Sequence, residues 1–404
     1  AMLDKNDEPC APSMLYTDPR GKEQCERLIN QFGAENLAFK TGAKTHEMYS
    51  LPKIMWIKEN MPENFARAEK ILLIQDYIVY MLCGVRQIDV SLAARTICFD
   101  IENKRWDKEI LEFAGIDENL LSTPVPTGTA AEKIKPELAR ELGISADCVI
   151  VSGAHDQIAA MQGANIRTNE QVMDGTGTVE CVPVLFDSVP QDFALYDMGY
   201  SLAPHPGGGY ACYVLSYTGG ATLKWFRDNF SDADYAELDK TVGEEPTELL
   251  IMPHFAGAAT PYMDANSKAA ILGLTFEHTK TDIYKALMEG TAYEITLNLE
   301  ILKKHGLSAR TVIATGGGAR SDVWLQIKAD VLGLAVTALD GKEIGGAGTA
   351  IMAGRAVGVY DENTILARPR KTFYPDEKRH AYYKNQLEKY KKIYAAAREV
   401  MRDE

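Results

Sequence analysis

The stretch TGGGARSDVWLQIKADVLGLAV, residues 315–336, carries the clearest signal of the fold class. The apolar run TVIA, 311–314, precedes it and is typical of a buried strand. Three glycines then separate this strand from a helix predicted over 321–333, and the apolar run AVTAL, 335–339, predicts another strand. Strands that alternate with helices in this way are typical of α/β proteins, in which ligands bind at the carboxyl ends of the strands.

The segments around this stretch continue the same alternation. Residues 172–186, VMDGTGTVECVPVLF, predict a strand, a tight turn and a second strand, and residues 210–220, YACYVLSYTGG, predict a third strand. A helix is expected from Ala221, so the second half of the chain opens with a β-β-β-α unit. The remaining predicted elements are a buried strand over 148–153 and helices over 21–33, 64–82, 136–143, 281–304, 345–358 and 376–404.

The composition excludes several classes of protein. A chain of 404 residues with 46% hydrophobic and 25% charged residues has enough apolar material for two cores. Its net charge of −14 argues against general binding to nucleic acid or to anionic membranes. The seven cysteines form no CxxC pair, which favours reduced core cysteines in a cytoplasmic protein over a metal or redox site. No stretch approaches the ~18 apolar residues of a membrane span.

A candidate catalytic carboxylate lies in GAHDQIAA, residues 153–160. Asp156 follows the end of the strand predicted over 148–153, where a substrate hydroxyl could bind and lose its proton to a carboxylate. The alternative is that Asp156 only caps the helix that follows it. The residues alone favour the cap slightly.

Two further glycine turns are candidates for holding phosphate. Residues 174–180, DGTGTVE, place two glycines and two threonines in a turn, where backbone N–H groups and hydroxyls are open to a ligand. Residues 218–221, TGGA, precede a helix whose first N–H groups point at one spot. The residues alone favour the alternative for each segment, which for the first is a plain hairpin turn that uses Asp-Gly and for the second a turn without a ligand.

The triple glycine of the opening stretch better suits adenine and ribose than phosphate. Three glycines between a strand and a helix let a flat ligand lie against the backbone, and the charge of Asp322 at the helix start would repel phosphate. A dinucleotide-binding turn is the rival, but its GxGxxG pattern is not met. No GxxxxGK[ST] motif occurs in the sequence, so phosphate binding by a P-loop is excluded at the level of the motif.

The order of these motifs resembles the FGGY family of carbohydrate kinases, with a mild preference for members of the xylulokinase type. The resemblance is strongest at MPHFAGAATPYMDANSKAAILGLTFEHTKTDIYKALMEGTAYEI, 252–295, and at 315–336, and GGAGTAIMAGRAVGVY, 345–360, is also similar. It extends to YTDPRG, 16–21, and TGAKTHEMYSLPKIMWI, 41–57. It implies an α/β protein with the two-lobed, actin-like ATPase fold of the ribonuclease H type. It also implies an ATP-dependent kinase that phosphorylates a hydroxyl of a small ketose or polyol.

By this resemblance, Asp156 is the catalytic base and Gln157, Asp18 and Arg20 contact the sugar. A structural ion pair or turn is an equal alternative for Asp18 and Arg20. The remaining expected site residues bind Mg²⁺-ATP through backbone and small side chains: Gly175, Thr176, Gly177, Thr178, Gly219 and Gly220 for the phosphates, and Gly317, Gly318, Ala319 and Asp322 for adenosine. The expected division is a sugar-binding lobe over 1–168 and a nucleotide-binding lobe over 169–404.

The sequence departs from the family at its start. Members open with a hairpin of the pattern DxGTxxxR, which binds phosphate, and neither this hairpin nor the sugar-contacting segment after it occurs here. The first lobe is therefore expected to be incomplete at its N-terminus. An alternative to the kinase is a non-catalytic sugar- or nucleotide-binding protein on the same fold. The expected partner is a small sugar or polyol rather than nucleic acid or a membrane, and a homodimer is left open.

Overall fold

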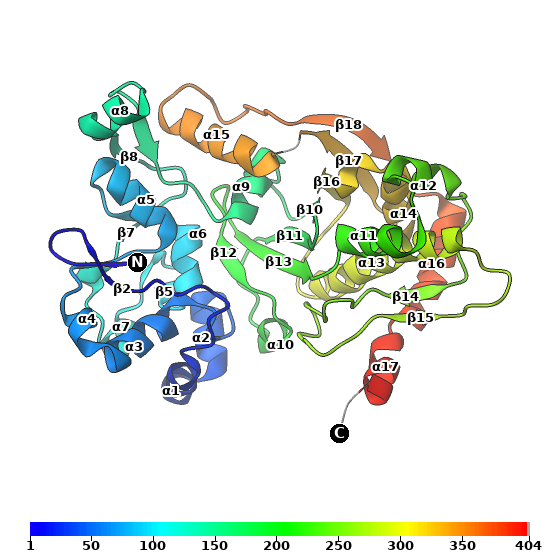
Figure 1. Ribbon diagram of the computed structural model, residues 1–404, viewed down its shortest axis with the longest axis horizontal. Coiled ribbons are helices and arrows are strands. Elements are labelled where there is room, and N and C mark those ends of the chain that lie inside the picture. The colour runs from blue at the N-terminus through cyan, green and yellow to red at the C-terminus, as the bar shows by residue number, and fades with distance from the viewer. Residues whose placement is uncertain (342, 402–404) are drawn as a thin grey trace.

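Two parts of the chain lie side by side in the computed structural model, which describes residues 1–341 and 343–401. Figure 1 shows the first part at the left, in blue and cyan, and the second part at the right; they meet around α9 and β12.

The helices of the first part are α1 (Lys22–Phe32), α2 (Ala34–Thr41), α3 (Ser50–Asn60), α4 (Pro62–Ala66), α5 (Ile74–Cys83), α6 (Val90–Ala93), α7 (Lys108–Ala114), α8 (Pro136–Leu142) and α9 (Asp156–Gly163). Its strands are β1 (Met2–Leu3), β2 (Pro9–Ala11), β3 (Lys70–Ile71), β4 (Gln87–Asp89), β5 (Phe99–Asp100), β6 (Arg105–Trp106), β7 (Thr123–Val125), β8 (Ala130–Lys133) and β9 (Val149–Val151).

The second part is built on one large sheet. Its strands are β10 (Gln171–Thr176), β11 (Glu180–Phe186), β12 (Leu202–Pro204), β13 (Tyr210–Ser216), β14 (Leu250–Met252), β15 (Ala270–Leu272), β16 (Thr311–Gly316), β17 (Ala335–Asp340) and β18 (Arg368–Phe373). Its helices are α10 (Phe193–Asp197), α11 (Gly220–Phe230), α12 (Tyr235–Thr241), α13 (Lys280–Lys303), α14 (Asp322–Leu332), α15 (Ile344–Ala356), α16 (Glu377–Tyr390) and α17 (Ile393–Met401). The predicted β-β-β-α opening is confirmed, with α10 and the short strand β12 inserted before the third long strand.

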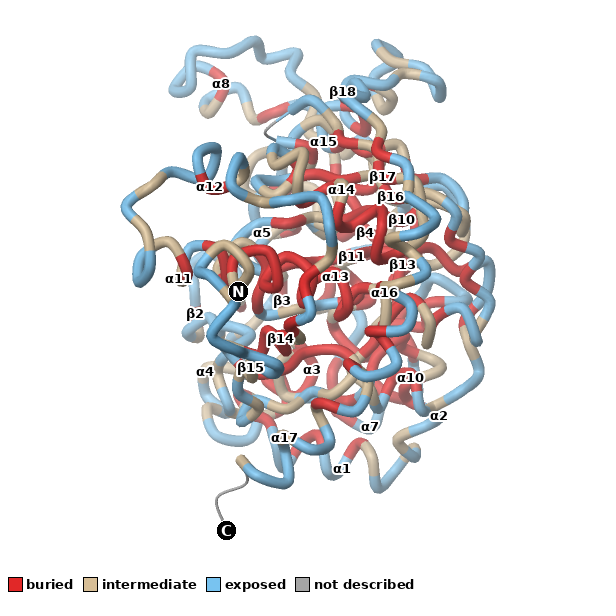
Figure 2. Tube along the Cα trace, turned by 90° about the vertical axis from the view of Figure 1, so that its right-hand side faces the viewer, coloured by how far each residue is buried: buried red, intermediate tan, exposed pale blue. Residues whose placement is uncertain are grey.

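Seven strands of the second part pair in the order β12-β13-β11-β10-β16-β17-β18. The three strands β10, β16 and β17 are parallel, and antiparallel strands extend the sheet on both sides. Helices α13 and α14 pack against each other and against strands of this sheet. Figure 2 shows that buried residues concentrate on these strands and on α13, while the outer loops are exposed. The large hydrophobic core therefore fixes the parallel strands whose ends carry the glycine turns.

In the first part, the described strands form smaller sheets. One sheet has three strands, β2-β1-β3, and the other strands pair two by two. The predicted strand over 148–153 exists as β9, but it pairs only with β8 and its three residues are half-buried rather than buried. The expectation of a fully buried strand before Asp156 was wrong, because β8 and β9 form an outlying two-stranded ribbon.

Two predicted helices are each broken into two. The single helix expected over 64–82 is interrupted between α4 and α5, because Lys70 and Ile71 pair with Leu3 and Met2 of β1. This pairing places Ile71 in the core, and tertiary burial overrides the helical pattern. The helix expected over 376–404 ends at Tyr390 and restarts as α17, and residues 402–404 lie outside the described residues. The other predicted helices end close to where the sequence places them; α8, for example, ends at Leu142, and the φ of 67° at the following Gly143 suits glycine.

Candidate active site

Two of the three glycine turns of the second part, at 174–180 and 316–318, lie next to each other. Strands β10 and β16 are parallel neighbours in which Thr176 pairs with Gly316, so both strands leave the sheet at the same edge. The approach is so close that a Cβ on Gly316 would lie 2.5 Å from the carbonyl oxygen of Thr176, and the φ of Gly316 is 81°. Glycine at 316 therefore permits the contact between the hairpin 174–180 and the turn 316–318.

A cavity of about 400 Å³ opens where these turns meet. We call it the hairpin cavity. It is lined by Gly177, Gly220, Leu223, Tyr235, Ala236, Asp239, Tyr284, Gly317, Gly318, Arg320, Ser321 and Trp324. The structure thus brings together glycines from all three turns that the sequence singled out. Its size is within the range of small-molecule sites, and its lining of aromatic and apolar side chains with a few polar groups is typical of them.

Asp239 is a polar group of the hairpin cavity that the sequence analysis missed. It lies on α12, and the hydroxyl of Tyr284 donates to its Oδ1 over 3.1 Å. Burial raises the pKa of Asp239, although hydrogen bonds from Ser321 and Tyr284 oppose this shift. No glycine motif or strand end marks Asp239 in the sequence, since only the packing of α12 over the turn brings it to the cavity.

The backbone donors expected to hold phosphate are partly used inside the chain. The N–H of Gly177 donates to Val179 O, and the N–H groups of Gly219 and Gly220 donate to the carbonyl oxygens of Thr178 and Gly177. The first turn of α11 is thereby fastened to the tip of the hairpin. Thr178 is exposed at this tip, and within the described chain neither its N–H nor its hydroxyl makes a hydrogen bond.

Two of the residues expected to bind adenosine do not line the hairpin cavity. Asp322 faces the opposite side of α14, where it pairs with Arg370 at 2.8 Å and Lys371 at 2.8 Å. It lines a separate cavity of about 570 Å³. Ala319 is buried, and its carbonyl oxygen accepts a hydrogen bond from Arg370. The charge of Asp322 is therefore compensated by two cations of β18, a pairing that the sequence could not predict.

Asp156 stands at the start of α9, at the edge of the first part. Its side chain is 80% exposed, and one of its oxygens, Oδ1, accepts the N–H of Gln157 and lies 3.2 Å from His155 Nδ1. His155, not Asp156, occupies the N-cap position of the helix. Gln157 is half-buried and follows directly. Neither residue lines the hairpin cavity, but the ring of His155 lies 5.3 Å from Tyr213 on β13, which places this loop beside the large sheet.

The loop that carries Asp156 is held by polar side chains from other elements. The hydroxyl of Ser91 accepts the N–H of His155 at 2.9 Å and donates to the buried Asp89 at 2.6 Å. With its amide turned to satisfy both groups, Gln75 accepts the N–H groups of Gly153 and Ala154. These contacts fix the backbone on the N-terminal side of Asp156 and leave its carboxylate open to solvent.

The surroundings of Asp156 also contain a cation. Burial and the neighbouring Arg95 lower the pKa of His155 to about 4, so His155 is neutral at physiological pH. Arg95 lies over the ring of Tyr49 at 4.8 Å and donates to Ser201 at 3.3 Å. The sequence analysis did not single out Arg95, because it lies far from any glycine turn in the chain.

Asp18 and Arg20 are bonded to each other in the structure. The guanidinium of Arg20 donates to both carboxylate oxygens of Asp18, which lowers the pKa of Asp18 well below its usual range. Arg20 lies over the ring of Trp56 at 4.7 Å, and Lys53 donates to the carbonyl oxygen of Asp18. Among the described residues, no hydrogen bond joins this pair to Asp156 or Gln157, so the geometry favours the ion pair over a sugar contact.

A metal ion has no ready-made site in the described part of the chain. No group of three or more His, Cys, Asp or Glu side chains there is placed to hold one.

No described helix is long and apolar enough to cross a membrane.

Comparison with known proteins places both parts in one family. Residues 1–163 match the N-terminal domain, and residues 176–357 the C-terminal domain, of the FGGY family of carbohydrate kinases. The xylulose kinase of Bacillus subtilis is 26% identical over 420 residues, which cover 99% of this chain and 81% of that protein. The gluconokinase of Bacillus licheniformis is 28% identical over 391 residues, which cover 90% of this chain and 74% of that protein.

Solved structures give the same result. The ligand-bound xylulose kinase from Lactobacillus acidophilus superimposes with a TM-score of 0.87 at 25% identity, covering 98% of this chain and 81% of that one. The glycerol kinase of Plasmodium falciparum with ADP has a TM-score of 0.86 at 21% identity, covering 97% and 81%. The second likeness supports the fold alone, which is the two-lobed actin-like ATPase fold.

Proposed function

Because the chain belongs to the FGGY family of carbohydrate kinases, we propose how its residues divide the work of moving the γ-phosphate of ATP to a sugar hydroxyl. Residues 169–404 hold the nucleotide and residues 1–168 hold the sugar. The observation that carries this proposal is the hairpin cavity, in which glycines of three separate turns meet beside aromatic side chains. Nothing in the comparisons favours the alternative of a non-catalytic binding protein.

Adenosine occupies the hairpin cavity in this proposal, and the phosphates pass over Gly177 and Thr178. The free N–H and hydroxyl of Thr178 are the donors left at the hairpin tip for the phosphates. Mg²⁺ bound to ATP would neutralise part of the phosphate charge and would arrive with the nucleotide. Gly219 and Gly220 then act by holding the tip, since their own N–H groups are already bonded.

Asp156 takes the proton of the sugar hydroxyl in this proposal. A carboxylate can do so when the hydroxyl lies within hydrogen-bonding reach, and Asp156 is exposed with only one oxygen in contact with the chain. The buried and neutral His155 beside it cannot compete as an ion-pair partner, so the carboxylate stays available. Gln157 is the adjacent substrate contact, while Asp18 and Arg20 support the lobe as an ion pair.

The acceptor is a small ketose or polyol. Two relatives named xylulose kinase match 99% and 100% of this chain, and one named gluconokinase matches 90%. Xylulose, a ketose, is therefore the first acceptor to test, and gluconate, a sugar acid, is the one to compare with it. To rank the acceptors, the rate of ADP formation from Mg²⁺-ATP is measured with each acceptor and divided by the rate without an acceptor.

The nucleotide site can be tested at Gly317. A Cβ there would meet a single atom within 4 Å, Thr176 O at 3.9 Å, so Gly317→Ala adds a methyl group to the cavity without a clash inside the protein. We expect ADP affinity to fall by roughly tenfold or more, because overpacking a close contact costs about 1–3 kcal/mol. Isothermal titration calorimetry measures the affinity. Gly318 is a poorer test position, since its Cβ would lie 2.7 Å from side-chain atoms of Thr176.

Gly345→Ala is the matched control for this experiment. Gly345 lies at the start of α15, outside the hairpin cavity, and a Cβ there meets nothing within 4 Å. Both variants should keep the melting temperature of the parent protein, and only Gly317→Ala should bind ADP more weakly. Equal ADP affinities for the parent and both variants would show that the nucleotide does not bind in this cavity.

A further inference from the structure

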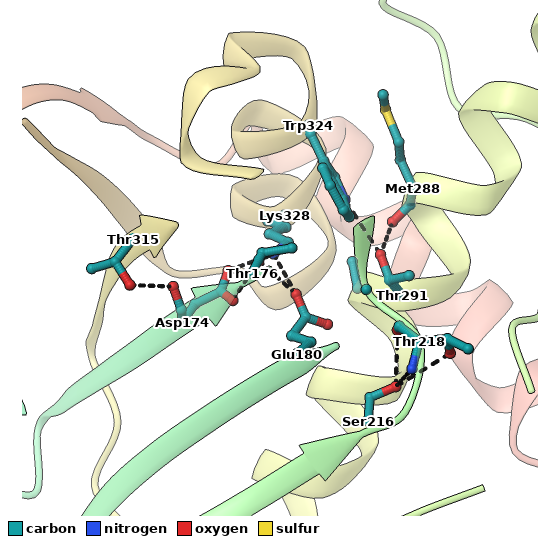
Figure 3. A network of polar contacts seen from close by, with 12 residues as sticks. Asp174, Thr176, Glu180, Ser216, Thr218, Met288, Thr291, Thr315, Trp324 and Lys328 are labelled. Carbon is teal, nitrogen blue, oxygen red and sulfur yellow. Dashed lines mark hydrogen bonds and ion pairs between the residues drawn. The ribbon is translucent and has the colours of Figure 1, made fainter. Parts of the chain in front are cut away.

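A fully buried charged cluster lies beneath the hairpin 174–180. Lys328 of α14 reaches across to β10 and β11, where its ammonium contacts Asp174 Oδ2 at 2.5 Å, Glu180 Oε1 at 2.7 Å and Thr176 Oγ1 at 2.7 Å. The three charged side chains are at most 2% exposed. Figure 3 shows Lys328 pointing at the hairpin, with Thr176 between the two carboxylates. The cluster therefore joins the hairpin to the helix that follows the adenosine turn.

The hydrogen bonds of this cluster require one more proton than its ionised groups supply. Thr176 Oγ1 lies 2.8 Å from Asp174 Oδ1 and 2.8 Å from Glu180 Oε1, while Lys328 donates to it. A hydroxyl has one proton and can donate to only one of the two carboxylates. The other contact is a hydrogen bond only if one carboxyl group carries a proton.

The charges point to the same conclusion. One ammonium faces two carboxylates, so the fully ionised cluster would bury a net negative charge, which is costly in a medium of low dielectric constant. Burial raises the pKa of Glu180 to about 7, although Lys328 opposes the shift. Glu180 Oε2 has no hydrogen-bond partner among the described residues.

We propose that Asp174, Glu180 and Lys328 form a proton-holding cluster that positions the phosphate hairpin, and that nucleotide binding at the hairpin tip raises the protonated fraction of Glu180, with the proton taken from solvent. This inference rests on the proposed role of the hairpin in binding phosphate. A polyphosphate at Gly177 and Thr178 adds negative charge near Glu180, and that charge favours the protonated carboxyl. The proton completes the bonds of Thr176 and fixes the hairpin against α14.

Among the groups of the cluster, Glu180 is the one that gains and loses the proton, as its neighbours show. Lys328 on α14 and Asp174 on β10 are the charged neighbours, and the buried thiol of Cys181 follows on the same strand. The strand β13 presents the uncharged Ser216 opposite Glu180, and Gly219 lies close on the side of α11. Burial lowers the pKa of Lys328 less than Asp174 and Glu180 raise it, so the ammonium keeps its proton.

Calorimetric titration of Mg²⁺-ADP at pH 7, in two buffers of different ionisation enthalpy, measures the protons taken up on binding. We expect an uptake of roughly half a proton per ADP beyond that of Glu180→Gln, because a group with a pKa near 7 is half protonated before binding. ADP itself contributes equally in both proteins, so their difference reports the cluster. ADP affinity of the parent should also weaken between pH 6 and pH 8, whereas the affinity of Glu180→Gln should follow only the titration of ADP.

Asp322→Asn is the control, since Asp322 lies on the same helix but pairs with Arg370 and Lys371 outside the cavity. It should keep the proton uptake of the parent. ADP binding with equal uptake in the parent and in Glu180→Gln, at pH 6, 7 and 8, would overturn the cluster proposal alone. Failure of the parent to bind ADP at all would overturn the proposed function and this inference with it.

Discussion

Replacing Asp156 with asparagine is expected to lower kcat by about 10²–10⁴-fold and to leave ADP affinity nearly unchanged. Asparagine keeps the size of the side chain but cannot accept the proton of the sugar hydroxyl at neutral pH. Asp156 lies outside the hairpin cavity, so the nucleotide should not sense the change. Steady-state kinetics with the preferred acceptor and calorimetry with ADP give the two readouts.

The control for this variant is Asp147→Asn, which removes an exposed carboxylate of the first part that pairs with Lys133. It should keep the parent kcat. Near-normal turnover of Asp156→Asn would mean that Asp156 serves only the local structure at the start of α9. Equal losses of turnover and of ADP affinity would instead show that the variant disturbs the fold.

Replacing Gly348 with alanine is expected to destabilise the protein by about 3 kcal/mol. Helices α9 and α15 cross here so closely that a Cβ on Gly348 would lie 1.7 Å from the carbonyl oxygen of Ala159. The reverse contact is equally tight, since a Cβ on Gly163 would lie 2.0 Å from Ile344 O. The helices must separate to admit the methyl group, and because α9 begins at Asp156, kcat should fall as well.

Urea-induced unfolding measures this loss, and Gly345→Ala on the same helix is its control. A methyl group at Gly345 meets nothing within 4 Å, so that variant should be as stable as the parent or slightly more stable. If Gly348→Ala were also as stable as the parent, the crossing would have room that the structure does not show.

The sequence predicted the elements that depend on local patterns. The strands β10, β11, β13, β16 and β17 coincide with apolar runs of the sequence, and β10, β13 and β16 lead into the glycine turns. The break between α4 and α5 could not be predicted, because it comes from the pairing of Ile71 with Met2, nearly 70 positions away. The same limit applies to β9, whose apolar residues look buried in the sequence and lie in an outlying ribbon.

The candidate site was predictable where it consists of backbone and not where it consists of side chains. Gly177, Gly220, Gly317 and Gly318 line one cavity, as expected from glycine turns at strand ends. Asp239 and Lys328 carry no local signal, since one depends on the placement of α12 and the other on a partner 154 residues away. Asp322 was expected at the adenosine site but lies outside the cavity, because its carboxylate pairs with Arg370 of β18, and the local sequence does not reveal this contact.

A crystal structure of the protein with Mg²⁺-ADP would show directly where the nucleotide binds. We expect the adenine ring in the hairpin cavity near Tyr284 and Trp324, with the diphosphate at the tip formed by Gly177 and Thr178. The most informative alternative position is the cavity of about 570 Å³ on the other side of α14, which is lined by Lys285, Lys371 and Arg379 among others. ADP bound there, or anywhere away from the hairpin tip, would show that the hairpin cavity is not the nucleotide site.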